Sequence, residues 1–134
     1  MNGELSFQFD HVHIFCTDLS ATERWFVEGL GAEMVARGDS LGTPSAKLRL
    51  AGMEFLLRVA RPGEQLQVVP SPRYGEDHLG LRVPDVDAAI VELRSRGVTI
   101  EMEPKDMGPD LRVAFVRGPD NLRMEILQRK GSQA

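Results

Sequence analysis

The chain has 134 residues, the usual length of a single domain. Hydrophobic residues make up 42% and charged residues 27%, which is typical of a globular protein with one sizeable core. The net charge of −4 argues against a general nucleic-acid binder, because phosphate backbones attract cationic surfaces. No apolar run is long enough for a membrane span, and the N-terminus does not resemble a signal peptide. With Cys16 as the single cysteine, we expect a cytoplasmic protein without disulfides.

An internal repeat organises the chain. Asp10–Ile14 reads DHVHI and Asp77–Leu81 reads DHLGL, with an offset of 67 residues between the two copies. In each copy a second aspartate, Asp18 or Asp85, stands seven residues after the first histidine. A repeat of this kind predicts two copies of one structural unit. Within a single domain we expect the first unit at 9–60, a connector at 61–76, the second unit at 77–128 and a frayed tail at 129–134.

Each unit is predicted to contain one strand, one helix and three further strands. Phe9–Cys16 is rich in β-branched and aromatic residues, which favours a strand. Ser20–Glu23 has the spacing of a capping box at the start of a helix. Apolar residues at helical spacing between Val86 and Leu93 predict the second helix, and Gly97 suits its C-terminal cap. We expect the other strands at 32–36, 46–51, 53–59, 98–102, 112–117 and 123–128, with a polar loop at 104–110.

The alternation of side chains along the first strand separates two faces. Val12, Ile14 and Cys16 make one face apolar, so His11 and His13 must lie on the other. The apolar face is expected to pack beneath the two amphipathic helices. The histidines therefore belong to the opposite, polar face of the sheet.

The same rule places His78 and Glu125 on the polar face of their own strands. If the sheet curls, His11, His78 and Glu125 converge on one divalent metal ion. Two imidazoles and one carboxylate suit Fe, Mn, Ni, Zn or Co, and three ligands leave positions open for water and substrate. Each residue taken alone is an ordinary hydrogen-bonded or surface side chain. The equivalent repeat positions of the histidines favour the metal site.

The segments around these residues resemble vicinal-oxygen-chelate proteins, the superfamily of glyoxalase I, bleomycin-resistance proteins and extradiol dioxygenases. The resemblance lies in Asp10–Ile14, Thr17–Leu19, Gly29–Gly31, Asp77–Asp85 and Gly118–Leu127. It implies an α+β fold in which two βαβββ modules form a cupped mixed β-sheet. It also implies a divalent metal, a substrate that chelates it through vicinal oxygens, and a homodimer that often completes the cavity.

One departure from the family bears on the reaction. Glyoxalase I has a fourth protein ligand on the fourth strand, and the offset of 67 residues puts Arg58 at that position. Neither Arg58 nor Leu56 can bind a metal, and Glu54 takes the place only if the alignment shifts by four residues. The chain therefore resembles the three-ligand members more closely, namely ring-cleaving dioxygenases and fosfomycin-resistance transferases.

Other polar-face residues are candidates for catalysis and substrate binding. His13 suits a general acid or base because its unperturbed pKa lies near neutrality, and Glu54 is a second candidate. The alternative for His13 is a structural hydrogen bond. Four side chains are expected to contact a small, anionic substrate, although each arginine alone is as well explained by a solvated position: Leu56, Arg58, Arg82 and Arg123.

Two functions follow from this pattern. The first is a metal-dependent lyase, isomerase or dioxygenase in which the metal polarises two substrate oxygens. The second is a metal-free protein that binds a small molecule or antibiotic, as bleomycin-resistance proteins do. The presence of all three candidate ligands favours the enzyme, because a binding protein does not need them.

Overall fold

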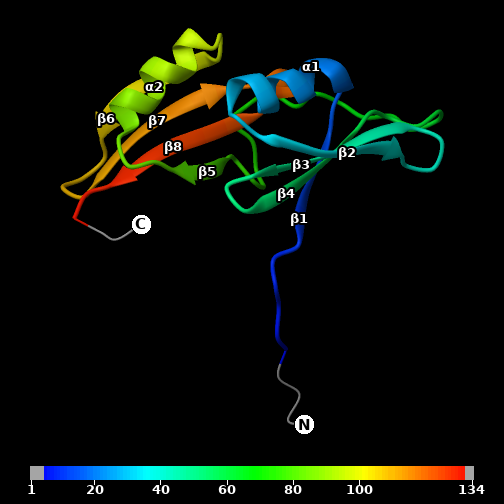
Figure 1. Ribbon diagram of the computed structural model, residues 1–134, viewed down its shortest axis with the longest axis horizontal. Coiled ribbons are helices and arrows are strands. Elements are labelled where there is room, and N and C mark those ends of the chain that lie inside the picture. The colour runs from blue at the N-terminus through cyan, green and yellow to red at the C-terminus, as the bar shows by residue number, and fades with distance from the viewer. Residues whose placement is uncertain (1–4, 132–134) are drawn as a thin grey trace.

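The computed structural model describes residues 5–131, and two βαβββ units follow one another along the chain (Figure 1). The first unit contains β1 (His11–Phe15), α1 (Leu19–Arg24) with its π-helical continuation Trp25–Gly29, β2 (Glu33–Asp39), β3 (Pro44–Leu50) and β4 (Met53–Arg58). The second contains β5 (Leu79–Arg82), α2 (Val86–Ser95), β6 (Thr99–Asp106), β7 (Leu111–Arg117), a 3-10 turn (Pro119–Asn121) and β8 (Arg123–Arg129). The expected α+β class and the paired βαβββ units are confirmed.

Each unit forms its own four-stranded mixed sheet. The strand orders are β1-β4-β3-β2 and β5-β8-β7-β6, so the last strand of each unit lies inside its sheet. The first and last strands pair in parallel, with His11 opposite Glu54 in one sheet and Gly80 opposite Glu125 in the other. The remaining pairs are antiparallel. The expected cupped sheet therefore consists of two hydrogen-bonded sheets placed side by side.

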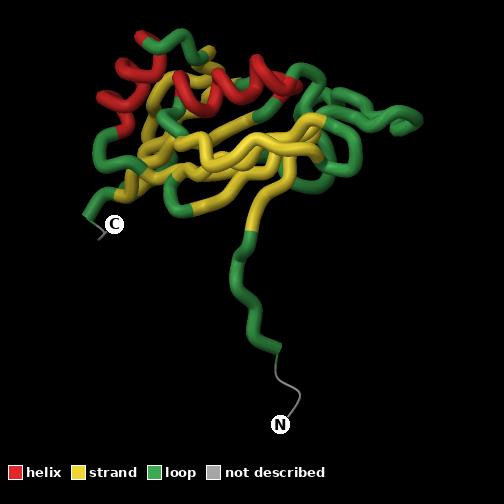
Figure 2. Tube along the Cα trace, turned by 45° about the vertical axis from the view of Figure 1, so that its right-hand side comes forward, coloured by secondary structure: helices red, strands yellow, loops and turns green. Residues whose placement is uncertain are grey.

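Both helices lie on the same side of the sheets and leave the opposite side uncovered (Figure 2). The alternation in β1 is as predicted, with Val12 and Ile14 packed against the core and both histidines exposed. One apolar core draws on both units; its largest fully buried side chains include Phe26, Leu48, Leu57, Ile90 and Met124. Within residues 5–131, no helix is long and apolar enough to cross a membrane.

The predicted capping box is wrong. α1 begins at Leu19, and its N-cap is Asp18, whose carboxylate accepts a hydrogen bond from the Ala21 backbone nitrogen at 2.9 Å. Asp85 caps α2 in the same way, through the Ala88 nitrogen at 3.1 Å. An Asp N-cap stabilises a helix by about 1 kcal/mol, and Ser20 has no such role because it lies inside the helix.

The expected loop at 104–110 is partly wrong, because β6 continues to Asp106. β6 is an edge strand, where the missing N–H of Pro104 can face away from the sheet, and its register with β7 is irregular around this residue. Gly97 has a φ of 84° directly after α2, as expected of a C-terminal cap. Arg129, the first residue of the predicted tail, still belongs to β8, and the tail's last residues, 132–134, lie outside the described part of the chain.

The two units are held together where the first helix meets the turn before β8. The Trp25 ring packs so closely on Gly118 that a Cβ there would lie 2.7 Å from Cε2 of the ring. Beside it, Thr17 donates two hydrogen bonds to the Asp120 carboxylate, from its backbone nitrogen at 2.9 Å and its hydroxyl at 2.8 Å. Asp120 has a φ of 56°, a left-handed conformation that turns its side chain toward the first unit.

We expect Gly118→Ala to lower the free energy of unfolding by about 1–3 kcal/mol, because the rigid Trp25 ring must move to admit the methyl group. Urea denaturation followed by circular dichroism measures the change. Gly38→Ala in β2 is the matched control, since its Cβ would lie 3.8 Å from the Ser45 hydroxyl, an ordinary contact. Equal stabilities for the two variants would contradict the tight packing between the units.

Candidate functional site

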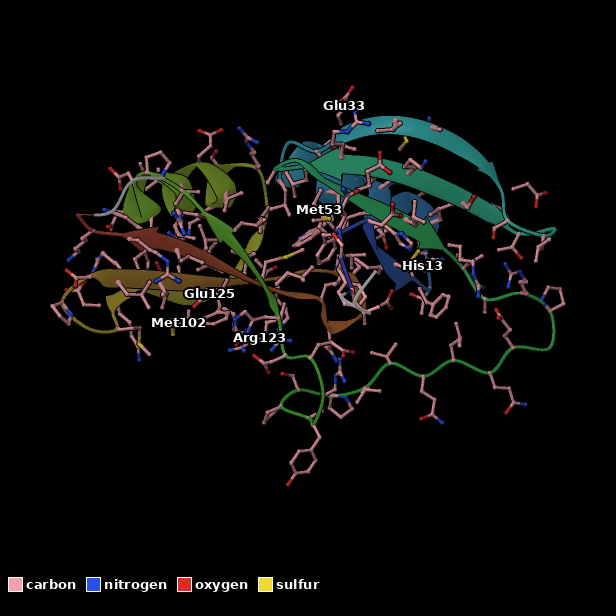
Figure 3. The ribbon with its side chains drawn as sticks, turned by 90° about the horizontal axis from the view of Figure 1, so that it is seen from below. His13, Glu33, Met53, Met102, Arg123 and Glu125 are labelled. Atoms are coloured by element: carbon pink, nitrogen blue, oxygen red, sulfur yellow. The ribbon has the colours of Figure 1, made fainter. Side chains whose placement is uncertain are left out.

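The polar face of the sheets carries the candidate residues. His13 on β1 and Glu125 on β8 lie on the uncovered side, in different halves of the molecule (Figure 3). The strand alternation explains their position, because neighbouring residues such as Met124 and Ile126 are buried toward the helices. The candidate site therefore faces away from the helices.

Each candidate metal-binding histidine is hydrogen-bonded to the aspartate that precedes it. His11 Nδ1 lies 2.6 Å from Asp10 Oδ2, and His78 Nδ1 lies 2.7 Å from Asp77 Oδ2. An ionised carboxylate only accepts hydrogen bonds, so Nδ1 is the donor to the aspartate in each pair, and Nε2 is the ring nitrogen that remains for a metal. This arrangement is the usual one for a histidine that binds a metal through Nε2.

The second sheet brings two candidate ligands together. His78 Nε2 lies 3.6 Å from Glu125 Oε1, within the roughly 4 Å that two ligands of one ion span. Gly80 pairs with Glu125 in the sheet, and a Cβ at this position would lie 3.4 Å from the carboxylate. The missing side chain leaves room beside Glu125 for a third group to approach.

His11 does not join this pair within one chain. It lies in the first sheet, opposite Glu54, whereas His78 and Glu125 belong to the second unit. Among residues 5–131 there is no group of three or more His, Cys, Asp or Glu side chains placed to hold a metal. One chain thus presents a His78–Glu125 pair and a separate His11.

Glu54 is paired with cations of the neighbouring strand. Its carboxylate lies 3.2 Å from the Arg49 guanidinium and 3.8 Å from the Lys47 amine, and is partly exposed. Its register places it beside His11 on the polar face. Leu56, the next residue of β4 on this face, pairs with His13 and is half-buried.

Arg58 is engaged with the connector. It is only 6% exposed, and its two terminal nitrogens donate to the Glu64 carboxylate at 2.7 and 3.0 Å. Its guanidinium also stacks 4.3 Å from the centre of the Phe15 ring. The hydrogen bonds from Arg58 and from the Arg61 backbone lower the pKa of Glu64 to about 2. Arg58 therefore anchors the connector to the first sheet.

Arg123 is similarly engaged in the second sheet. It donates to Glu101 at 3.1 Å, contacts Asp77, and stacks 4.0 Å from the centre of the Phe115 ring. Through Asp77 it is linked to His78, whose ring meets Phe115 edge-on at 5.0 Å. Arg82 is exposed at the end of β5, and it is also not without an interaction partner. An anionic substrate would have to exchange with the carboxylates that now pair with Arg58 and Arg123.

A cleft of about 1060 Å³ separates β1 from the connector and the start of β5. Its lining includes His13 from the first unit, with His78 and Arg123 from the second. The connector contributes Leu66 and Val68 to the opposite wall. Partial burial, followed by the charge of Arg58, lowers the pKa of His13, so this imidazole is neutral at neutral pH.

Four residues that orient the candidate ligands and arginines were not among the predicted site residues. Asp10 and Asp77 hold the two histidines, and Glu64 and Glu101 hold the two arginines. The aspartates had a visible signal, because Asp-His occurs at the same position in both copies of the repeat. The glutamates had none, since each contacts its arginine only through the fold.

Comparison with known proteins supports one family. Residues 8–126 match the family described as Glyoxalase/Bleomycin resistance protein/Dioxygenase superfamily. The uncharacterized protein YaeR of Escherichia coli (strain K12) is 26% identical over 91% of this chain and 96% of its own length. A glyoxylase/bleomycin resistance protein/dioxygenase domain from Frankia sp. EAN1pec has a TM-score of 0.78 at 24% identity, covering 97% of this chain and 96% of that one. A glyoxalase family protein from Bacillus cereus has a TM-score of 0.79 at 16% identity, covering 98% and 99%.

We expect Glu64→Gln to destabilise the protein at neutral pH, because it removes the charge that Arg58 binds. The pKa of Glu64 is about 2 in the folded chain against 4.5 ordinarily, so this stabilisation is present above about pH 4.5 and is lost as the pH falls toward 2. The difference in unfolding free energy between native and variant chains should shrink over that interval. Urea titrations at a series of pH values measure it, and a difference that is constant below pH 4.5 would contradict the assignment.

Proposed function

Because the chain belongs to the glyoxalase/bleomycin resistance protein/dioxygenase superfamily, we propose that it is a divalent-metal-dependent enzyme acting on a small, anionic substrate. The proposal rests on one observation, the His78–Glu125 pair at 3.6 Å with the His78 Nδ1 proton held by Asp77. Lyase, isomerase and dioxygenase reactions are all compatible with these residues. The bound metal, one of Fe, Mn, Ni, Zn or Co, would act as a Lewis acid on two neighbouring substrate oxygens.

We propose that two chains share each metal site. His78 and Glu125 supply two ligands, and His11 of the partner subunit supplies the third. Three facts support this: the described part of one chain has no three-ligand group, His11 is exposed with its Nδ1 held by Asp10, and Glu125 and His13, the second residue after His11 on the same face of β1, both lie on the uncovered side of the sheets (Figure 3). In a twofold homodimer the same contact occurs twice, which gives two equivalent sites.

The protein's own side chains would then orient the metal ligands and transfer protons. Asp77 holds His78 in one tautomer, and Arg123 holds Asp77. The partner subunit's His13 arrives with the partner's His11, because both lie on one face of the same strand. A neutral imidazole at this position is able to take a proton from the substrate and return it at another atom. Glu54, the second proton-transfer candidate, lies beside His11 in the sheet.

Substrate contacts would come from both sheets. Arg82 and Arg123 belong to the half with His78, whereas Leu56 and Arg58 belong to the half with His11. Displacing Glu101 from Arg123 would free a guanidinium for a substrate carboxylate or phosphate. We infer an anionic substrate because Arg58 and Arg123 already bind carboxylates that a substrate anion could replace.

A metal-free binding protein is the second candidate. The cleft of about 1060 Å³ favours it, because a cavity of this size accepts a drug-sized molecule without any metal. Metal analysis separates the two functions.

We expect the native chain to bind one divalent ion per subunit after incubation with Fe, Mn, Ni, Zn or Co. His78→Ala, Glu125→Ala and His11→Ala should each weaken binding by more than about 100-fold, since each removes a ligand. Mixing the His11→Ala and His78→Ala chains should restore one site per mixed dimer, because that dimer keeps one intact set of ligands. Elemental analysis and competition with a chelator measure both effects.

Val91→Ala, at an exposed position on α2, is the control and should bind metal like the native chain. If no metal binds the native chain, the enzyme proposal fails and the binding protein is favoured. If the single variants lose metal but mixing restores none, the site belongs to one chain and the shared arrangement is wrong.

Asp77→Asn should lower metal affinity by about 10- to 100-fold while leaving the fold intact, because the hydrogen bond that orients His78 is weakened. Asp87→Asn is the matched control, since Asp87 pairs with Arg112 on the helix side. Equal metal affinities of the two variants, measured by chelator competition, would contradict a role of Asp77 in orienting His78 for metal binding.

A further inference from the structure

The segment that precedes β1 exposes three large apolar side chains. Leu5, Phe7 and Phe9 are 80%, 86% and 71% exposed, and residues 5–10 belong to no helix or strand. The segment leaves the molecule on the side opposite the helices, as both views show (Figures 1 and 2). We call residues 5–10 the arm.

The pattern of the arm is that of a strand with one apolar face. Its apolar residues alternate with Ser6 and Gln8, so in an extended conformation all three point to the same side. Contiguous exposed apolar side chains of this kind mark a contact surface. Since all three are largely exposed in the single chain, a second surface that covers them would bury apolar area.

We propose that the arm docks on a second copy of this chain, in the cleft that separates β1 from the connector and the start of β5. The inference rests on the shared site proposed above, which brings His11 of one copy to His78 of the other. Phe9 lies only two residues before His11, so a shared site carries the arm onto the partner. From His11 to Leu5 an extended chain covers about 20 Å.

The cleft has the surface that this arm requires. Asp77 and His78 are among its lining residues, and the partner's β1 would begin beside them. The connector wall carries Leu66, Val68 and Val69, each about half exposed. Apolar side chains on the arm thus match apolar side chains on the cleft. A twofold dimer would cover both pairs of these surfaces at once.

The test uses metal-free protein, so that subunit association is measured independently of the metal. We expect sedimentation analysis to find a native dimer whose dissociation constant rises about tenfold or more in Phe7→Asp and in Val68→Asp, because each puts a charge in the apolar contact. Both residues are exposed in the single chain, so the variants should fold. Val91→Asp, at a position on α2 that is 68% exposed, should associate like the native chain.

Hydrogen exchange of the arm amides provides a second measurement, with slow exchange expected in the native dimer and fast exchange in Phe7→Asp. A monomeric native chain, or a Phe7→Asp variant that associates as tightly as Val91→Asp, would overturn the proposal. A Val68→Asp variant without effect would overturn the placement in the cleft. Metal titration of the same samples keeps the two proposals apart. A dimer that depends on the arm but binds no metal would support the docking of the arm and contradict the proposed metalloenzyme. A dimer that binds metal but is unaffected by Phe7→Asp would support the metal site and contradict the docking of the arm.

Discussion

The packing of Trp25 on Gly118, with the two hydrogen bonds from Thr17 to Asp120, determines how the two halves of the molecule sit. The relative placement of the two sheets on the polar face depends on this junction. It sets the first sheet beside the second, with both helices on one side (Figures 1 and 2), and within residues 5–131 it leaves His11 outside the His78–Glu125 pair. A molecule whose halves met differently would bring different polar side chains together from the same two sheets. The division of the candidate ligands is therefore a property of the junction and not of either sheet.

Strand alternation allowed the faces of the sheets to be predicted, because the apolar side chains of β1 leave His11 and His13 only one side on which to lie. The repeat allowed the paired units to be predicted. It also contained the N-caps of both helices, Asp18 and Asp85, which the prediction of a capping box at Ser20 overlooked. Neither pattern describes how one unit is placed against the other. That placement depends on a glycine beside a tryptophan ring, far apart in the sequence and without any periodic signal. The convergence of the three ligands was expected from strand alternation, the repeat and the family resemblance, and none of these specifies a distance between side chains of the two units.

The arginines show a second limit of reasoning from patterns. Parity placed Arg58 and Arg123 on the polar face, where a free guanidinium suits an anion. In the fold each is stacked on a phenylalanine and paired with a carboxylate, so neither guanidinium is immediately available to an anion. Paired arginines resist nonspecific anions, since any ligand must offer more than the carboxylate that it displaces. Such pairing connects the structure of the site to its selectivity.

The position of β8 inside its sheet has a consequence for how the chain folds. β5, α2, β6 and β7 all precede it in the sequence, yet β5 has no hydrogen-bonded neighbour in its sheet until β8 enters between it and β7. During synthesis the second half must therefore wait, with its apolar surface uncovered, for residues 123–129 to appear. The first half has the same topology, and β1 waits in the same way for β4, but β4 is complete at residue 58. The first half can therefore offer a finished surface on which the sheet of the late strand assembles.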